Sequence, residues 1–150
     1  MNELMAYALL WLSALSSASL LPGSSEIVMG GLWYQGYAPL LLWLVATSGN
    51  VAGSLVNWWL GGQVARFSDR RWFPATPEQM QRAEVWMAKF GPFALLLSWV
   101  PVVGDPLTLV AGVLRMPILL FVTLVALAKG ARYAVLLLLA DQLLKPLLSQ

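Results

Sequence analysis

Residues 98–106 read SWVPVVGDP and interrupt a long apolar region between residues 93 and 114. Pro101, Gly104 and Pro106 should break a helix there, because proline lacks the backbone N–H and glycine weakens a helix. The break leaves backbone groups unpaired and carries the carboxylate of Asp105. Irregular backbone survives at membrane depth only where it is buried in protein or lines a wet cavity. We therefore interpret this stretch as the tip of a re-entrant hairpin.

A second interruption shows the same order of features. Residues 21–26 read LPGSSE, and here too an acid follows a proline by four positions, at Glu26 as at Asp105. Pro39 and Pro117 then each open a long apolar segment, thirteen residues after Glu26 and twelve after Asp105. This order, found twice, is a weak internal repeat. Paired interrupted segments in matching positions indicate a transporter-type binding site.

The composition is typical of an integral membrane protein. Of 150 residues, 59% are hydrophobic and only 11% are charged, whereas about a quarter are charged in soluble domains. The chain has no cysteine and no histidine, which excludes disulfides, thiol catalysis and the usual zinc and haem ligands. We expect no metal and no cofactor. The net charge of +2 comes from few basic residues and does not indicate nucleic-acid binding.

The pattern predicts an all-α integral membrane protein, an inverted repeat of a re-entrant helical hairpin plus one transmembrane helix. A short cytoplasmic amphipathic helix joins the repeats. Residues 27–36 are too few to cross a membrane, so the first segments are interpreted as a hairpin; a full span over residues 4–21 is the alternative. The expected single domain, 1–150, comprises repeat one (4–62, with hairpin 4–36 and span 39–60), a connector (61–91) and repeat two (92–141, with hairpin 92–115 and span 117–140).

The connector at 61–91 sets the expected orientation. It holds five basic residues, so the positive-inside rule places it in the cytoplasm and both termini outside. Within it, Thr76, Pro77 and Gln79 are typical of a helix start, as N-cap, first helical residue and capping-box partner. The apolar face of the helix that follows indicates an interfacial amphipathic helix.

The second span carries two basic residues, Lys129 and Arg132. They are three positions apart and therefore share a helix face. Each costs roughly 2.5–3.5 kcal/mol to insert into lipid, and their natural partners are Glu26 and Asp105. Such ion pairs either serve transport or only hold the hairpins in place. A further reading has Glu26 capping the half-helix that begins there.

The first span carries a stripe of small and polar residues at three- and four-residue spacing. Asn50, Ser54 and Asn57 belong to it, together with Gly49 and Gly53. Close helix packing through small residues is one interpretation. The other is that the polar side chains face a cavity, and the two interpretations are compatible.

These motifs resemble the DedA family, the membrane proteins with a "SNARE-associated" or VTT domain, and most closely its short YqaA-like branch. The resemblance covers nearly the whole chain, and the run at 98–105 is its most specific part. The motifs that carry it are LLPGSSE at 20–26, Gly49-Asn50 with Gly53 and Gly61, SWVPVVGD at 98–105, Ala111-Gly112, Met116, and Lys129 with Arg132-Tyr133.

The resemblance implies two membrane-embedded hairpins that meet tip to tip, and a bacterial inner-membrane location. It also implies movement of lipids or lipid carriers between leaflets, tied to the proton gradient. The sequence departs from the larger DedA proteins, which carry arginines beside the proline of the second tip, where this chain has Ser98 and Gly104. They also carry an aspartate where this chain has Ser54. Lys129 and Arg132 would therefore have to supply the positive charge.

Two functions stay open. The first is a translocator of a lipid, a lipid carrier or a small solute, with protons as the candidate coupling ion. The second is a non-transporting membrane scaffold or assembly factor whose intramembrane charges are structural ion pairs. We expect no enzyme, since no serine has a visible base, and we expect membrane lipids and a second copy of the chain as partners. The candidate pathway residues are Glu26, Asp105, Lys129, Arg132, Asn50, Ser54 and Asn57, and the candidate tip residues are Pro22, Gly23, Pro101, Gly104 and Pro106.

Overall fold

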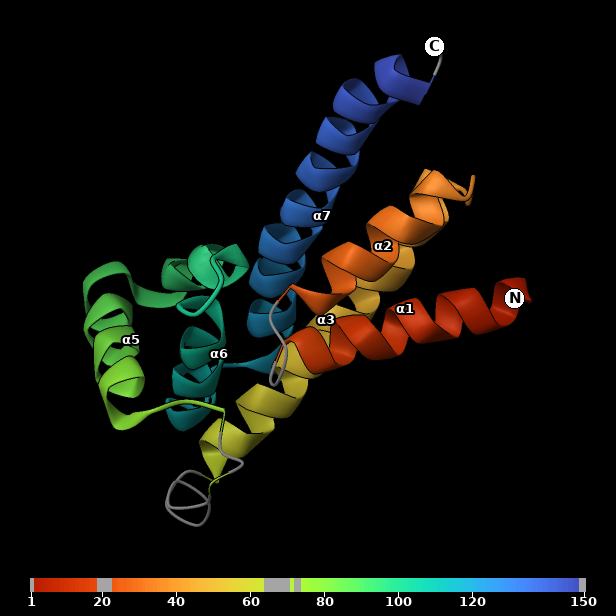
Figure 1. Ribbon diagram of the computed structural model, residues 1–150. Coiled ribbons are helices and arrows are strands. Elements are labelled where there is room, and N and C mark those ends of the chain that lie inside the picture. The colour runs from red at the N-terminus through yellow and green to blue at the C-terminus, as the bar shows by residue number, and fades with distance from the viewer. Residues whose placement is uncertain (1, 19–22, 64–70, 72–73, 149–150) are drawn as a thin grey trace.

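The computed structural model describes residues 2–18, 23–63, 71 and 74–148. Every regular element in this part of the chain is helical (Figure 1). The elements in chain order are α1 (Glu3–Ser17), α2 (Ser24–Tyr34), α3 (Pro39–Gly62), α5 (Pro77–Phe90), η1 (Gly91–Trp99), α6 (Gly104–Val113) and α7 (Ile118–Leu148).

Two long helices form the frame of the molecule. Pro39–Gly62 and Ile118–Leu143 are the described segments that are long and apolar enough to cross a membrane. They coincide with the two expected spans, and each begins at or just after a proline, which suits the first turn of a helix. In Figure 1, α1 and α2 lie to the right of α7, and η1, α6 and α5 lie to its left.

The helices α1 and α2 meet at the centre of the molecule and diverge from there (Figure 1). Ser24 of α2 bonds to Ser13 of α1, and Ser25 bonds to Ser17. Gly23 precedes α2 with φ +90°, a left-handed conformation that glycine adopts without a Cβ penalty. Pro22, expected at this tip, lies outside the described residues.

The second broken segment differs from the expected pair of α-helical halves. Its first half, η1, is a 3₁₀-helix, which rises about 2.0 Å per residue instead of 1.5 Å. Nine residues of η1 therefore reach about as far as the ten residues of α6. The turn between them contains Val102 at φ +70°, a strained conformation for a β-branched residue.

The helix α3 packs against both broken segments through glycines. A Cβ at Gly49 would lie 2.6 Å from the Trp11 carbonyl oxygen of α1. Gly112 of α6 likewise presses on the backbone of Trp58 in α3. The small-residue stripe of α3 therefore packs closely against its neighbours, as one of its two interpretations expected.

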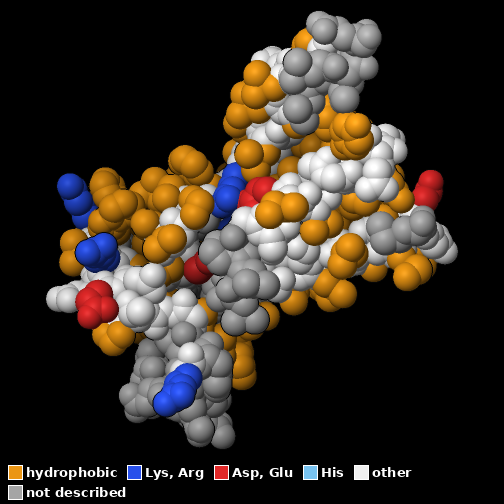
Figure 2. Space-filling model, in the orientation of Figure 1, with side chains coloured by type: hydrophobic (Ala, Val, Ile, Leu, Met, Phe, Trp, Pro, Cys, Tyr) orange, Lys and Arg blue, Asp and Glu red, His pale blue; other side chains and the backbone are white. Residues whose placement is uncertain are grey.

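The helix α5 forms as the sequence predicted. Thr76 accepts from the Gln79 amide and its own amide donates to the Gln79 side chain, so the capping box is complete. The helix packs inward through Ala83 and Met87 and leaves Trp86 partly exposed. Figure 2 shows charged side chains over α5 at the left, further basic and acidic side chains at the centre, and hydrophobic side chains in patches elsewhere on this face.

Candidate functional site

Two acid–base pairs lie on α7, one toward each broken segment. Lys129 Nζ is 3.6 Å from Asp105 Oδ1 in the first turn of α6. Arg132 Nη2 pairs with Glu26 Oε1 in the first turn of α2. The four charges that the sequence singled out are therefore brought together, in the pairs of opposite sign that lower the cost of burial.

Arg132 reaches both broken segments at once. Its Nη1 donates to the Trp99 carbonyl oxygen at the end of η1, at 2.8 Å, while Nη2 holds Glu26 of α2. The second carboxylate oxygen of Glu26, Oε2, is buried and has no hydrogen-bond partner in the described part of the chain. Arg132 thus connects the two tip regions, which are 73 residues apart at Glu26 and Trp99.

A chain of hydrogen bonds starts at Lys129. Its ammonium donates to Asn50 Oδ1, and Asn50 Nδ2 donates to the Tyr133 hydroxyl at 2.8 Å. The Tyr133 and Ser25 hydroxyls are 2.7 Å apart, and Ser25 donates to Ser17. Either hydroxyl of the Tyr133–Ser25 pair can act as the donor. Hydrogen bonds therefore connect the Asp105–Lys129 pair with the α1–α2 pair without a break.

Asn57 makes a second connection between the two tips. Its Nδ2 donates to the Ala18 carbonyl at the end of α1, at 2.8 Å, and to Thr108 Oγ1 of α6, at 3.2 Å. Thr108 in turn donates to the backbone oxygen of Asp105 at 2.7 Å. Ser54 is buried beside these residues and donates to the Asn50 carbonyl of its own helix.

The four candidate tip residues that the structure describes take different positions. Gly104 presses against the backbone of Ser98, so a Cβ there would overlap it. Pro101 lines an apolar groove between η1 and α7, and Pro106 lines a cavity beside α5. Gly23 has the left-handed backbone that begins α2.

Sequence reasoning gave no role to Tyr133, Ser25 or Thr108. Tyr133 is four residues after Lys129 and therefore lies on the same face of α7, a signal that could have identified it. Ser25 is adjacent to Glu26, but no spacing rule connects it with Tyr133. Groups of acids that could hold a metal ion are absent from the part of the chain that the structure describes.

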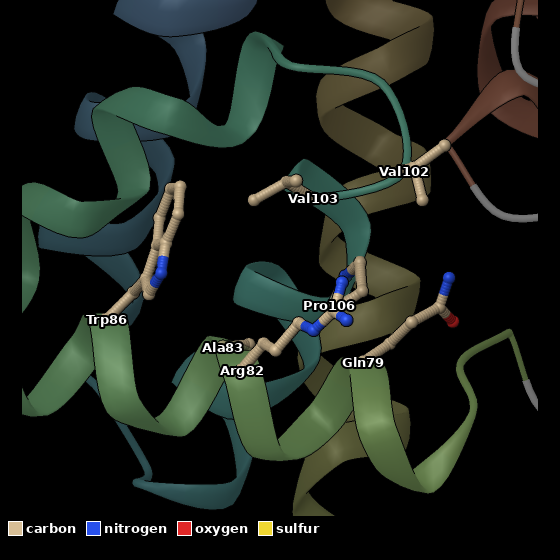
Figure 3. Close-up of a pocket in the computed structure, with 7 residues that line it drawn as sticks. All are labelled: Gln79, Arg82, Ala83, Trp86, Val102, Val103 and Pro106. Atoms are coloured by element: carbon tan, nitrogen blue, oxygen red, sulfur yellow. The ribbon is translucent and has the colours of Figure 1, made fainter.

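Two hollows lie next to the polar network, and neither is lined by Asp105, Lys129 or Asn50. One has a volume of about 130 Å³. In Figure 3, Arg82 and Gln79 extend from α5 toward Pro106 in the first turn of α6 and Val102 in the turn before it. The other, the η1–α7 groove, has a volume of about 560 Å³ and is lined by Arg132 among apolar residues.

Comparison with known proteins gives consistent matches. Residues 21–142 match the VTT domain. The chain is 39% identical over 139 residues to "Inner membrane protein YqaA" of Escherichia coli strain K12, covering 89% of each chain. It is 34% identical over 149 residues to an "Uncharacterized protein" of Haemophilus influenzae, covering 90% of this chain and 87% of that one.

A more distant relative is the "Uncharacterized membrane protein YbfM" of Bacillus subtilis, 26% identical over 114 residues, with 71% of this chain and 70% of that one covered. No solved structure matches the chain.

Proposed function

The chain belongs to the VTT domain family, which is the DedA family of membrane proteins, and on that premise we propose that it is a small transporter-like protein of the bacterial inner membrane. It moves a lipid, a lipid carrier or a small solute across or between leaflets, with protons as the candidate coupling ion. The name of the Escherichia coli relative, an inner membrane protein, supports the location. No enzymatic step belongs to this proposal.

The proposed topology places α3 and α7 across the membrane and both broken segments as re-entrant hairpins. Residues 61–91, with α5, lie in the cytoplasm, and both termini lie outside. The exposed apolar surface of the two long helices supports this arrangement: Leu40 is 67% exposed and Leu119 is 81% exposed. Side chains of this kind are stable against lipid and costly against water.

The observation that carries the proposal is the position of the charges. Lys129 and Arg132 lie on the middle turns of a helix that is long and apolar enough to cross a membrane, and they meet Asp105 and Glu26 where the two broken segments converge. Ionisable groups inside a membrane are expensive and mark substrate or ion pathways. Arg132 and Asn57 each touch both hairpins, so a movement of either tip changes the surroundings of these charges.

The scaffold function keeps specific support. Both acids and both bases are paired, and Lys129 is further held by Asn50. Closed pairs of this kind would suffice to join the hairpins to α7. A scaffold needs no water at the tips, whereas a translocator needs a path to them.

Whether water reaches the hairpin tips distinguishes a translocator from a scaffold. The chain has no cysteine, so single cysteines can be placed at Ser24 in hairpin one and at Val102 in hairpin two. Membrane-impermeant maleimides are then added from each side of sealed vesicles that contain the folded protein. Gly104 is unsuitable for a cysteine because a Cβ there would overlap Ser98.

A translocator should label at Ser24→Cys from outside and at Val102→Cys from inside. Cysteines at the exposed Gln35 and Gln81 serve as positive controls for the two sides. Full protection of both tips, with both controls labelled, would contradict translocation and leave the scaffold.

A further inference from the structure

The η1–α7 groove has the form of a ligand site. Leu96, Trp99 and Pro101 make its wall on the side of η1 and the following turn, and Ala131 and Val135 belong to its wall on α7. Its volume of about 560 Å³ falls within the range of roughly 300–1,000 Å³ that small-molecule sites occupy. The groove is almost wholly apolar, with one charged side chain, as such sites commonly are.

The shape of the groove favours a hydrocarbon chain. Its α7 residues recur at three- and four-residue spacing between Leu127 and Leu136, so they form one stripe along the helix. At 1.5 Å per residue this stripe is about 14 Å long. It lies inside the segment of α7 that is able to cross a membrane, and two of its residues, Leu127 and Val135, are more than half exposed. A linear apolar chain parallel to α7 would cover them.

The charge in the groove favours an anionic headgroup. Arg132 uses one terminal nitrogen for the Trp99 carbonyl and the other for Glu26, whereas a guanidinium has five N–H donors. Its side chain is 25% exposed, so donors remain for a further oxygen. Glu26 is an internal anion that already occupies part of this site, and Arg132 suits phosphate as well as carboxylate.

We propose that the η1–α7 groove binds one hydrocarbon chain of an anionic membrane lipid, whose acidic headgroup competes with Glu26 for Arg132. The inference rests on the proposed function in that α7 must cross the membrane. It also makes the cargo an amphiphile rather than a small water-soluble solute. Hairpin one then regulates the groove, because Glu26 withdraws from Arg132 whenever a lipid headgroup is bound.

Fluorescence quenching tests the site without a transport assay. A cysteine at Val135, in the groove wall, is labelled with an NBD fluorophore, and the protein is placed in phosphatidylcholine vesicles. The probes are phosphatidylglycerol and diacylglycerol, each with a nitroxide on one acyl chain. The label on a matched cysteine at Val56, which is 46% exposed on α3 outside the groove, reports ordinary contact with bilayer lipid.

At Val135→Cys we expect quenching that saturates, with phosphatidylglycerol half-saturating at a mole fraction about tenfold below diacylglycerol, because charge-assisted hydrogen bonds to Arg132 add to affinity. At Val56→Cys quenching should rise in proportion to the probe and be equal for both lipids.

Ala131→Phe fills the groove and should abolish saturation, whereas Ala140→Phe, on the same helix beyond the groove, should not. Glu26→Gln removes the competing carboxylate and should increase the preference for phosphatidylglycerol, a gain that misfolding cannot produce.

Linear quenching at Val135→Cys, equal for the two lipids and unchanged by Ala131→Phe, would overturn the proposal. An unchanged preference in Glu26→Gln would overturn the competition. Saturable quenching in a protein whose tips are sealed to maleimides would support the groove and contradict translocation, so the two proposals fail separately.

Discussion

The hydroxyl of Tyr133 has two partners on two different helices, Ser25 of α2 and Asn50 of α3. The side chain is 1% exposed, so water cannot replace either partner. Asn50 in turn holds Lys129. One phenolic oxygen therefore connects the ammonium on α7 with the serines of the α1–α2 pair.

Tyr133→Phe should lower the free energy of unfolding by about 1–3 kcal/mol, because it leaves the Asn50 amide without a buried acceptor. SDS-induced unfolding of the protein in mild detergent measures the change. Tyr34→Phe is the matched control, since Tyr34 is 65% exposed. Equal stability of the two variants would contradict the described network.

The glycines of α3 determine how closely the elements approach one another. Gly49 lets α1 approach α3 closely at the Trp11 backbone and the Ala14 side chain. Gly30, in the middle of α2, has no such neighbour within 4 Å of an added Cβ. The same residue type therefore serves close packing in one helix and has no packing partner in the other.

Gly49→Ala should destabilise the protein by about 1–3 kcal/mol, because the added methyl overpacks the α1–α3 contact. Gly30→Ala should instead be stabilising by up to about 1 kcal/mol, since alanine favours the helix and meets nothing. Thermal unfolding of the two variants in one detergent compares them directly. A loss of stability of the same size in both variants would mean that close packing does not explain the glycine at position 49.

The Asp105–Lys129 pair joins α6 to α7. Asp105→Leu leaves the Lys129 ammonium buried without its counter-charge and should cost about 3–5 kcal/mol of stability. The double variant Asp105→Leu with Lys129→Met removes both charges and should be more stable than Asp105→Leu alone. The free energies of unfolding of Asp105→Leu, Lys129→Met and the double variant together give the coupling energy between the two side chains. A double variant as unstable as the sum of the singles would mean that the two side chains do not interact.

At the scale of the whole molecule, two broken segments approach α3 and α7 from opposite ends and meet in the middle (Figure 1). Asn57 and Arg132 touch both of them. An inverted repeat gives such an arrangement, because each half supplies one broken segment and one long helix. The topology that we propose follows from it.

The proposed topology predicts labelling from opposite sides. A cysteine at Gln35, in the exposed turn between α2 and α3, should react with an impermeant maleimide only from outside the cell. A cysteine at Gln81, exposed on α5, should react only from the cytoplasm. Right-side-out and inverted vesicles measure the two accessibilities, and labelling of both positions from one side would contradict the inverted arrangement.

The helical class, the two long helices and the capped helix at Pro77–Phe90 could be read from the sequence. Their signals are local: runs of apolar residues, prolines at helix starts and the capping box at Thr76. The pairing of Glu26 and Asp105 with Arg132 and Lys129 could also be expected, since buried charges need partners. Which acid pairs with which base could not, because nothing in the spacing prefers one pairing.

The remaining features depend on contacts between distant segments. The hydrogen bond between the Tyr133 and Ser25 hydroxyls and the groove between η1 and α7 each require two elements to be placed against each other. Hydrophobic periodicity specifies which face of a helix is apolar but not which neighbour covers it. The sequence by itself therefore determined a helical membrane protein with two broken segments and four charged residues within its apolar regions. Only the tertiary structure decided how those charges pair and connect, because hydrogen bonds and close packing depend on distances that a linear sequence does not contain.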